Sequence, residues 1–195
     1  MPTRIQTSRL LLREWQDADL EPFARINADP EVMRFFPEPM SRDASDRLVA
    51  RIREHFAEHN YGLWAVQVIA DDAGEPTPSE NTCIGFIGLS TAAFQAHFTP
   101  AVEIGWRLAR EAQGLGYATE GARAVLTYAF ESLALPEVVS FTSVYNLTSR
   151  RVMEKIGLIH TPTGDFDHPA LPVGHRLRRH VLYRLRNPNL PDPAA

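Results

Sequence analysis

A strand that runs through a glycine-rich turn into a helix is the feature that most constrains this chain. Residues 101–109, AVEIGWRLA, alternate as a β-strand does, and residues 117–133 carry the apolar repeat of a helix. Gly114 and Gly116 lie between them. Glycine permits a turn whose successive N–H groups point inward, and the positive end of the following helix adds to their attraction for anions. The stretch predicts an anion-binding turn, although a turn that serves only helix–sheet packing would contain the same glycines.

Two familiar phosphate-binding devices do not fit this turn. A dinucleotide fingerprint needs a third glycine at position 119, which is Thr119, and a P-loop needs a nearby lysine, whereas the chain's single lysine is Lys155. What remains is a turn that holds a diphosphate with backbone N–H groups, without a metal or a lysine. The small side chain of Ala118 leaves room for such a group near the helix axis.

The remaining elements predict a mixed α/β sheet in a single domain, residues 1–186, followed by a disordered tail, residues 187–195. We expect a solvated loop over 71–81 and a Pro/Gly/His-rich loop over 161–175. One predicted helix buries Leu20, Phe23, Ala24 and Ile26, and the next buries Leu48, Ile52 and Phe56. The expected strands cover 8–15, 62–70, 82–90, 101–109, 136–144 and 178–186, and the expected helices cover 17–27, 41–59, 117–133 and 149–157.

Composition narrows the classes of function. A formal net charge of −4 argues against a dedicated nucleic-acid binder. No apolar run reaches the roughly 18 residues needed to span a bilayer, and the N-terminus lacks a signal-peptide pattern, so we expect no membrane partner. The single cysteine, Cys83, suits a reducing cytoplasm. Self-association as a homodimer stays open.

The turn and its surroundings together resemble one family. Residues 113–118, QGLGYA, are similar to the Q/R-x-x-G-x-G/A motif with which the GCN5-related N-acetyltransferases (GNAT) bind the pyrophosphate of coenzyme A. Residues 103–135, 146–158, 7–15 and 29–36 resemble the ribosomal-protein N-terminal acetyltransferase (RimJ/RimL-like) branch, and the likeness is weakest over 162–175. The resemblance implies a mostly antiparallel central sheet flanked by helices, with a parallel pair of strands splayed apart at an acetyl-CoA site.

The resemblance also implies which residues hold acetyl-CoA. The backbone amides of residues 115–119 would bind the pyrophosphate, and the main chain of residues 106–108 would pair with the pantetheine arm. A bulge near Leu108 would direct an N–H at the thioester carbonyl, and Asn146 would bond to the pantetheine. The implied cofactor residues are Trp106, Arg107, Leu108, Gln113, Gly114, Leu115, Gly116, Tyr117, Ala118, Thr119, Asn146 and Ser149.

Two residues are candidates for the proton transfers. Glu103 would act as a base or orient a water, because an alkyl ammonium with a pKa near 10.4 must lose a proton before it attacks; alternatively it pairs with an arginine on the sheet. Many family members use a tyrosine to protonate the departing thiolate, but Met153 stands at that place. Ser149 is the nearest substitute unless it caps the short helix, Tyr145 is a second candidate, and the thiolate could leave unassisted.

The acceptor side is the least defined part of the sequence. The aspartates Asp165 and Asp167 would meet a cationic amine, and the spacing of the acids and histidines in this region matches no standard zinc pattern, so we expect no metal. A second set of residues could line the acceptor side instead, although each is typical of a core. The first group is Asp165, Asp167, His168, His175 and His180, and the second is Trp15, Phe35, Phe36, Tyr61 and Trp64.

These features predict an acetyl-CoA-dependent N-acetyltransferase that acts on a primary amine by direct attack. Cys83 lies in an apolar strand, which argues against a covalent carrier. The acceptor is left open among a protein N-terminus, an amino acid, a polyamine and an antibiotic. The alternative is a coenzyme A-binding regulatory module without turnover, which the missing tyrosine motivates.

Overall fold

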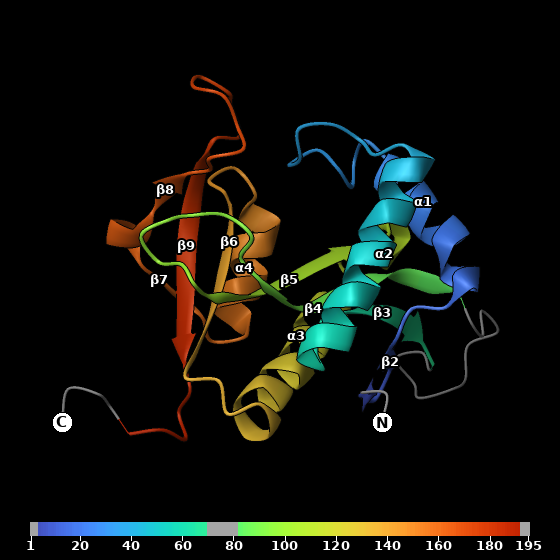
Figure 1. The fold of residues 1–195 in the computed structure, drawn as a ribbon, viewed down its shortest axis with the longest axis horizontal. Coiled ribbons are helices and arrows are strands. Elements are labelled where there is room, and N and C mark those ends of the chain that lie inside the picture. Colours follow the sequence, from blue (N-terminus) through green and yellow to red (C-terminus); the bar gives the residue numbers. More distant parts are fainter. Residues whose placement is uncertain (1–3, 70–81, 192–195) are drawn as a thin grey trace.

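The computed structural model describes residues 4–69 and 82–191, so the loop predicted over 71–81 lies outside the described residues. The described strands form a nine-stranded sheet in the order β1-β2-β3-β4-β5-β6-β9-β7, with β8 paired to β9 (Figure 1). The strands are β1 (Ile5–Gln6), β2 (Leu10–Arg13), β3 (Leu63–Val68), β4 (Cys83–Thr91), β5 (Val102–Leu108), β6 (Glu137–Ser143), β7 (Ile159–His160), β8 (Phe166–Asp167) and β9 (Arg179–Arg186).

The sheet is mostly antiparallel, as predicted. Every neighbouring pair of strands is antiparallel except β5 and β6, which are parallel and meet at one register position, Glu103↔Val139. The strands β1 to β5 form one continuous meander, and β6, β9, β7 and β8 form the other half of the sheet. The mixed α/β fold class is confirmed, and the one parallel pair marks the seam between the two halves.

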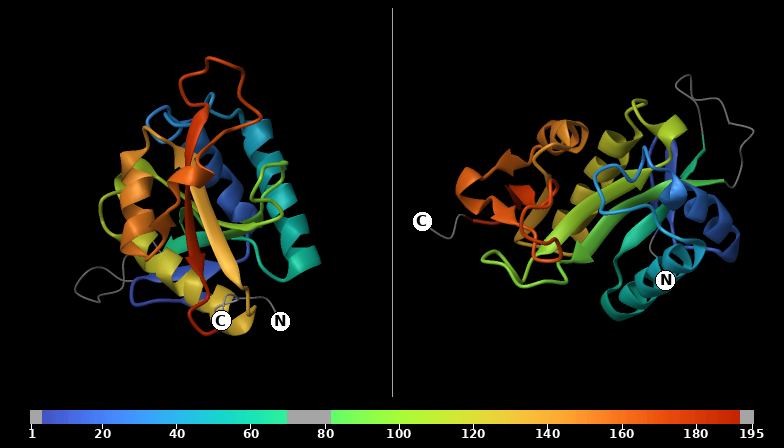
Figure 2. Two further views of the ribbon diagram at one scale, coloured as in Figure 1. Left: turned by 90° about the vertical axis from the view of Figure 1, so that its left-hand side faces the viewer. Right: turned by 90° about the horizontal axis from the view of Figure 1, so that it is seen from above.

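Helices cover both faces of the sheet. The structure contains α1 (Leu20–Ala28), α2 (Arg42–His59), α3 (Tyr117–Thr127) and α4 (Leu147–Lys155). The α1 residue Phe23 meets Phe86 of β4 at 6.0 Å between ring centroids, whereas a Cβ at Gly121 of α3 would lie 2.5 Å from Ile87. Because successive strand residues point to opposite faces, α1 and α3 lie on opposite sides of the sheet, as Figure 2 shows.

The two N-terminal helices follow the predicted patterns with one shift. Phe23, Ala24 and Ile26 are buried on α1, as predicted. In α2, Ser41 caps the N-terminus by accepting from the Ala44 N–H at 3.2 Å. Its fully buried face carries Ser45, Val49 and Ile52, while Leu48 and Phe56 are only partly buried. The stripe is therefore rotated from the predicted one, because the sequence pattern alone does not say which side of a wide apolar face meets the sheet.

Two other predictions near the C-terminus need correction. The predicted loop over 161–175 contains the short strand β8 and a 3₁₀ turn, Pro162–Gly164, that pack on β9. Asn187, placed at the start of a disordered tail, is 4 % exposed, and its Nδ2 donates to the carbonyls of Phe130 at 3.2 Å and Leu135 at 3.0 Å. These bonds join the end of β9 to the chain that follows α3, which a local sequence pattern does not reveal.

Two glycines that face each other across β4 and β5 make a matched test of backbone packing. A Cβ at Gly88 would lie 2.1 Å from the carbonyl oxygen of Gly62, whereas a Cβ at Gly105 would meet only Glu103 Oε1, at 3.8 Å. Gly88→Ala should therefore lower the free energy of unfolding by about 1–3 kcal/mol, and Gly105→Ala should change it much less. Urea unfolding of both variants measures the difference, and equal losses would contradict this packing.

Candidate active site

A side-chain hydrogen bond marks the point where the two parallel strands separate. Directly after the Glu103↔Val139 position, the Ser140 hydroxyl donates to the Ile104 carbonyl at 2.8 Å. Ser140 is 2 % exposed, so this bond is shielded from water. Beyond it, β5 and β6 no longer pair, and a gap opens between them. The splayed parallel pair that the family resemblance implied is present, and Ser140 is a contributor that the sequence reading did not identify.

The gap exposes backbone groups of β5. In an antiparallel ladder, alternate residues direct both their N–H and C=O groups to the same neighbour. The Ala109 N–H donates to Ile84 at 2.8 Å, which places the odd-numbered residues of β5 toward β4. Trp106 and Leu108 therefore direct their N–H groups into the gap. The predicted bulge near Leu108 is absent, because the β4–β5 register runs without a shift from Gly85↔Leu108 to Thr91↔Val102.

The glycine turn lies at the open end of this gap. Gly114 has φ of 81° and Gly116 has φ of 85°, and α3 begins at the next residue. A Cβ at Gly114 would have no heavy atom of the described chain within 4 Å, so the space before the turn is open. The Gln113 Nε2 donates to the Leu108 carbonyl at 3.0 Å, which ties the turn to the end of β5. Backbone N–H groups at the start of α3 are thus presented to an anion.

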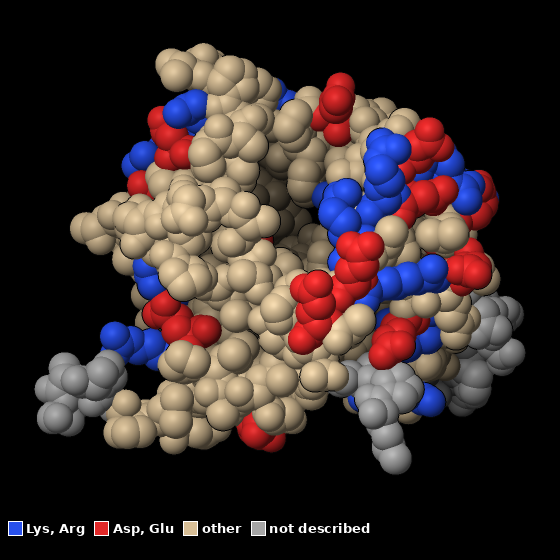
Figure 3. All heavy atoms as spheres, in the orientation of Figure 1, with Lys and Arg blue, Asp and Glu red and all other residues tan. Residues whose placement is uncertain are grey.

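A cavity of about 760 Å³ joins the turn, the gap and the loop between α1 and α2 (Figure 3). The residues implied for cofactor binding all line it except Leu115, whose side chain is 49 % exposed. Several further lining residues were not predicted, among them Thr142 and the basic residues Arg151 and Lys155 of α4. Lysine and arginine side chains beside a phosphate-binding turn suit the charge of a nucleotide, although their scattered positions give no sequence motif.

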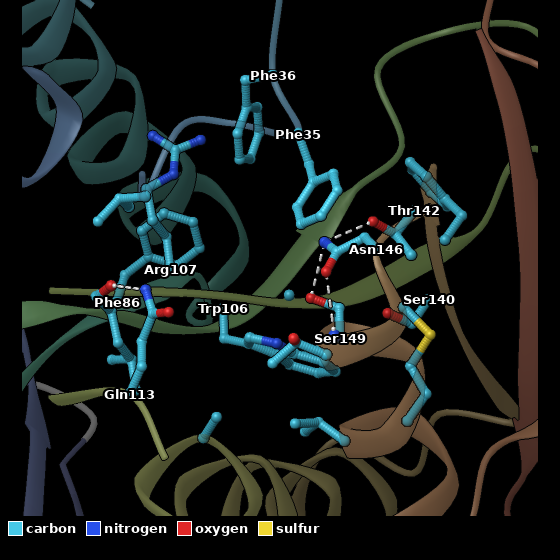
Figure 4. Close-up of a pocket in the computed structure, with 18 of the residues that line it drawn as sticks. Phe35, Phe36, Phe86, Trp106, Arg107, Gln113, Ser140, Thr142, Asn146 and Ser149 are labelled. Atoms are coloured by element: carbon cyan, nitrogen blue, oxygen red, sulfur yellow. Dashed lines mark hydrogen bonds between the residues drawn. The ribbon is translucent and has the colours of Figure 1, made fainter. Parts of the chain in front are cut away.

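Asn146 organises the far side of the gap. Its Oδ1 accepts from the Ser149 backbone N–H at 3.2 Å, which caps α4, and its Nδ2 donates to the hydroxyls of Thr142 and Ser149, each at 3.0 Å (Figure 4). Asn146 therefore caps the helix, and the alternative role of Ser149 as its cap is wrong. Because the Ser149 oxygen accepts from Asn146, its own proton remains available to a group in the cavity.

The site fits acetyl-CoA. The open space before Gly114, the N–H groups at the start of α3 and the N–H groups of Trp106 and Leu108 offer donors to a pyrophosphate and to the amides of an extended arm. Residues 9–159 match the family described as Acetyltransferase (GNAT) domain, which is most of the chain. The chain belongs to the GNAT acetyltransferase family.

Individual relatives agree with this assignment. The N-acetyltransferase YnaD of Bacillus subtilis, itself uncharacterized, is 30% identical over 159 residues, which cover 79% of this chain and 81% of YnaD. YdaF of the same organism, described as a putative ribosomal N-acetyltransferase, is 44% identical over 57 residues. This stretch covers 29% of the present chain and 31% of YdaF. A GNAT-family acetyltransferase from Bacillus anthracis superposes with a TM-score of 0.74 at 25% identity, covering 95% of this chain and 99% of that one.

The GNAT chain is thus an acetyl-CoA-dependent N-acetyltransferase, as the sequence predicted. Among its described residues, no helix is both long and apolar enough to cross a membrane. Cys83 is 1 % exposed, and burial raises the pKa of its thiol to about 12, which leaves it poorly suited to carry an acyl group.

Glu103 lies on the cavity wall of this acetyltransferase where the two strands part. Burial raises the pKa of its carboxyl to about 8. Across residues 4–69 and 82–191, no arginine pairs with it, so the alternative role of a surface ion-pair partner is not observed. A desolvated carboxyl with a raised pKa beside a cavity is typical of a functional group.

The other candidates for proton transfer differ in whether they line the cavity and whether they can donate a proton. Met153 is 1 % exposed and lines the cavity, at the place where many family members carry a tyrosine. Tyr145 is 59 % exposed and does not line the cavity, so the structure does not support it as the acid. Ser149 lines the cavity and keeps its proton free. Of the three, Ser149 alone combines position with a proton to give.

The aspartates predicted to hold the acceptor do not reach the cavity. Asp165 bonds to His160 Nε2 at 2.9 Å and accepts from the Leu182 N–H at 3.1 Å, which fixes it against β9. Asp167 pairs with Arg178 at 3.2 Å and with Arg179 at 3.6 Å. Neither aspartate lines the cavity. Their role in acceptor binding is therefore not supported, because charge in a loop sequence does not reveal which neighbours neutralise it.

Two histidines of the same region do line the cavity. The rings of His168 and His180 lie 5.0 Å apart, and burial lowers the pKa of both. His175 accepts from the Leu177 N–H at 3.2 Å and lies outside the lining. Within the part of the chain that the structure describes, no cluster of His, Cys, Asp or Glu residues could hold a metal ion.

The predicted aromatic residues divide between core and cavity. Trp15 and Trp64 are 6 % and 0 % exposed and belong to the core, with the Trp15 indole donating to the Leu63 carbonyl at 2.7 Å. Tyr61 packs on His59 outside the cavity. Phe35 and Phe36, from the loop between α1 and α2, face into it (Figure 4). The acceptor side is therefore built partly by this loop.

Binding of acetyl-CoA at the turn can be tested with a pair of glycines. Submillimolar acetyl-CoA should raise the melting temperature of the wild type, whereas NAD and ATP should not. Gly116→Val should abolish this shift, because valine rarely adopts a φ of 85° and would disturb the turn. Gly174→Val is the matched control, since Gly174 has the same φ of 85° in an exposed loop. If both variants lose the shift equally, the turn is not the binding site.

Proposed function

We propose that this acetyltransferase transfers the acetyl group to a primary amine by direct attack, with Glu103 as the base or water-orienting group and Ser149 as the proton donor. Acetyl-CoA supplies a thioester whose carbonyl carbon accepts the amine and whose sulfur leaves as a thiolate. The observation that carries the proposal is the position of Glu103, a half-buried carboxyl without a described partner, on the cavity wall where β5 and β6 part.

Glu103 is suited to take a proton near neutral pH. Its pKa of about 8 lies between those of an ordinary carboxyl and an alkyl ammonium, so it can accept a proton and release it again. The carboxyl acts on the amine directly or through a water. Because no described arginine pairs with the carboxyl, an incoming amine can approach it, and the fraction that is ionised, which grows as the pH rises toward 8, can take the proton.

The backbone of β5 supports the developing negative charge. Trp106 and Leu108 direct N–H groups into the gap, and fixed backbone donors stabilise an oxyanion without reorganising during the reaction. The bulge expected from the family resemblance is not required for this role, because the splay itself leaves the N–H groups of alternate residues facing the gap.

Ser149 is positioned to donate to the thiolate from the first turn of α4. The bond from Asn146 Nδ2 fixes the Ser149 oxygen at 3.0 Å and leaves the hydroxyl proton directed elsewhere. The missing tyrosine therefore does not leave the cavity without a donor. The alternative of a coenzyme A-binding module without turnover would predict the loss of such groups, whereas Glu103 and Ser149 both line the cavity.

Replacing Glu103 should change the pH dependence of the reaction. The base must be ionised, so kcat/KM of the wild type should rise with pH up to about 8, the pKa of this carboxyl. Glu103→Gln should lower turnover roughly 100-fold and remove the part of the rise that follows the pKa of about 8, leaving only the rise that follows the pKa of the amine, with acetyl-CoA binding intact. Steady-state thiol release from pH 6 to 10 measures both effects. An unchanged profile with a good acceptor would remove Glu103 from the mechanism.

The same variant gives a stability readout that is independent of activity. The pKa of Glu103 is raised from 4.5 to about 8 on folding, so the native state holds this proton more tightly than the unfolded state. Stability from this group is full below pH 4.5 and is lost as the pH rises through 8. Glu103→Gln should thus gain melting temperature relative to the wild type between pH 6 and pH 9. A constant difference would show that Glu103 is not desolvated.

Ser149 can be tested without disturbing α4, in whose first turn it lies. Ser149→Ala keeps the backbone N–H that Asn146 caps, so stability should change little. Turnover should fall by roughly tenfold, at the low end for an acid catalyst because a thiolate is a good leaving group. Ser149→Thr keeps the hydroxyl and should retain most of the activity. If the alanine variant turns over at the wild-type rate, the thiolate leaves without help from Ser149.

A further inference from the structure

Arg107 is a buried cation in the cavity that no described acidic residue neutralises. It is 8 % exposed, and its Nη1 donates to Asn27 Oδ1 at 2.6 Å. Its Nε is buried and has no hydrogen-bond partner. In the described chain, no carboxylate forms an ion pair with this guanidinium. Arg107 lines the cavity (Figure 4). It lies on the same face of β5 as Glu103, because the two residues are four apart on the strand.

The surroundings orient the guanidinium without cancelling its charge. Asn27 and Ser45 are both 0 % exposed, and Asn27 donates to the Ser45 hydroxyl at 2.8 Å, which fixes the amide that holds Arg107. The guanidinium carbon lies 4.2 Å from the centre of the Phe36 ring and 5.5 Å from that of Phe86. Aromatic faces and a neutral amide attract a cation weakly, so a full positive charge remains to be compensated.

A second arginine of the same sheet shows the usual arrangement. The Arg13 side chain is 11% exposed, and it binds Asp19 through two bonds, at 2.7 and 2.9 Å. Arg107 is buried to a similar degree without such a partner. Burial lowers the pKa of Arg107 to about 10, so it still carries its charge at neutral pH. A desolvated, uncompensated charge is costly to the fold, and at a ligand cavity such a cost is typically offset when an anion binds.

Acetyl-CoA is an unsuitable source of that anion. Its phosphates would be held at the glycine turn and the basic residues of α4, whereas Arg107 extends to the opposite face, toward α1 and the Phe36 loop. That face also carries Glu103, four residues away on the strand. This part of the cavity therefore offers Glu103 to take a proton from an amine and Arg107 as a cation for an anionic group.

We propose that Arg107 binds a carboxylate of the acceptor, so that the enzyme selects amines that also carry a carboxylate, as amino acids and short peptides do, over polyamines. The planar guanidinium can donate to both oxygens of a carboxylate through its terminal nitrogens, because Nε is buried. A polyamine would instead bring a second positive charge toward Arg107. This inference rests on the proposed function, because it names the acceptor class of the same site.

The test compares acceptors that differ in one charge. Thiol release with acetyl-CoA is measured for alanine against alaninamide, for Ala-Ala against its C-terminal amide, and for spermidine. The wild type should use at least one free acid with a kcat/KM ten times or more that of its amide, and should use spermidine worse than that acid. Equal use of acid and amide in both pairs, or a preference for spermidine, would overturn the proposal.

Variants test whether Arg107 causes the preference for the free acid over the amide. Arg107→Gln should lower kcat/KM for the free acid by roughly 10- to 100-fold and leave the amide nearly unchanged, because it removes a charged hydrogen bond. Arg107→Lys keeps the charge and loses the planar guanidinium, so it should retain part of the preference for the free acid. It also provides the test if the glutamine variant does not fold. Arg53→Gln is the matched control, since Arg53 pairs with Asp17 at 2.8 Å outside the cavity. A loss of acid preference in the control, or its retention in both Arg107 variants, contradicts the assignment.

A binding measurement separates failure of this inference from failure of the proposed function. Calorimetric titration of the coenzyme A-saturated protein with N-acetylalanine and with N-acetylalaninamide needs no turnover. The acid should bind at least ten times more tightly, and Arg107→Gln should abolish the difference. If no amine is acetylated but the acid still binds preferentially, the proposed catalysis is wrong and the carboxylate site stands. If amines are acetylated but acid and amide bind alike, the carboxylate site is wrong.

Discussion

The site depends on the separation of β5 and β6, and the hydrogen bond from the Ser140 hydroxyl to the Ile104 carbonyl lies where that separation begins. A parallel pair of strands normally continues its ladder, and each backbone group is then satisfied by its neighbour. Here a side chain takes the place of the next ladder bond, at 2.8 Å, and β5 and β6 part. The N–H groups of Trp106 and Leu108 are left facing a gap that leads to the glycine turn. The Ser140 bond thus satisfies the Ile104 carbonyl at the point where pairing ends, and the donors beyond it remain available to a ligand.

Successive side chains of β5 point to opposite faces of the sheet, so each face receives different functional groups. Glu103 and Arg107 point to the face of α1 and α2, and Trp106 points to the face of α3. Both ionisable groups lie in low-dielectric surroundings that shift their pKa in opposite directions, to about 8 for the acid and about 10 for the arginine. Each is costly to bury alone, and neither has a described partner of opposite charge. The strand therefore holds two unneutralised groups in one cavity, which suits an acceptor that carries both an amine and an acid.

Much of this arrangement could be read from sequence because its signals are local. The turn at Gly114 and Gly116, the helix that follows and the meander before it all lie within short segments whose spacing is informative. The acceptor side could not be read in this way. Asp165 and Asp167 looked available in the loop, but Asp165 is hydrogen-bonded to His160 and Asp167 pairs with Arg178 and Arg179. The phenylalanines that do reach the cavity come from a loop far away in the chain.

The sequence by itself determined the family, the mixed sheet and the cofactor turn, because periodicity and glycine conformation act over a few neighbouring residues. Only the tertiary structure decided which polar groups remain without partners. Arg107 resembles Arg13 in the sequence as an arginine on a strand, yet one meets Asp19 and the other meets Asn27 and two aromatic rings. Burial and pairing are properties of residues brought together from distant segments, and they set the charge that the cavity presents to its substrate.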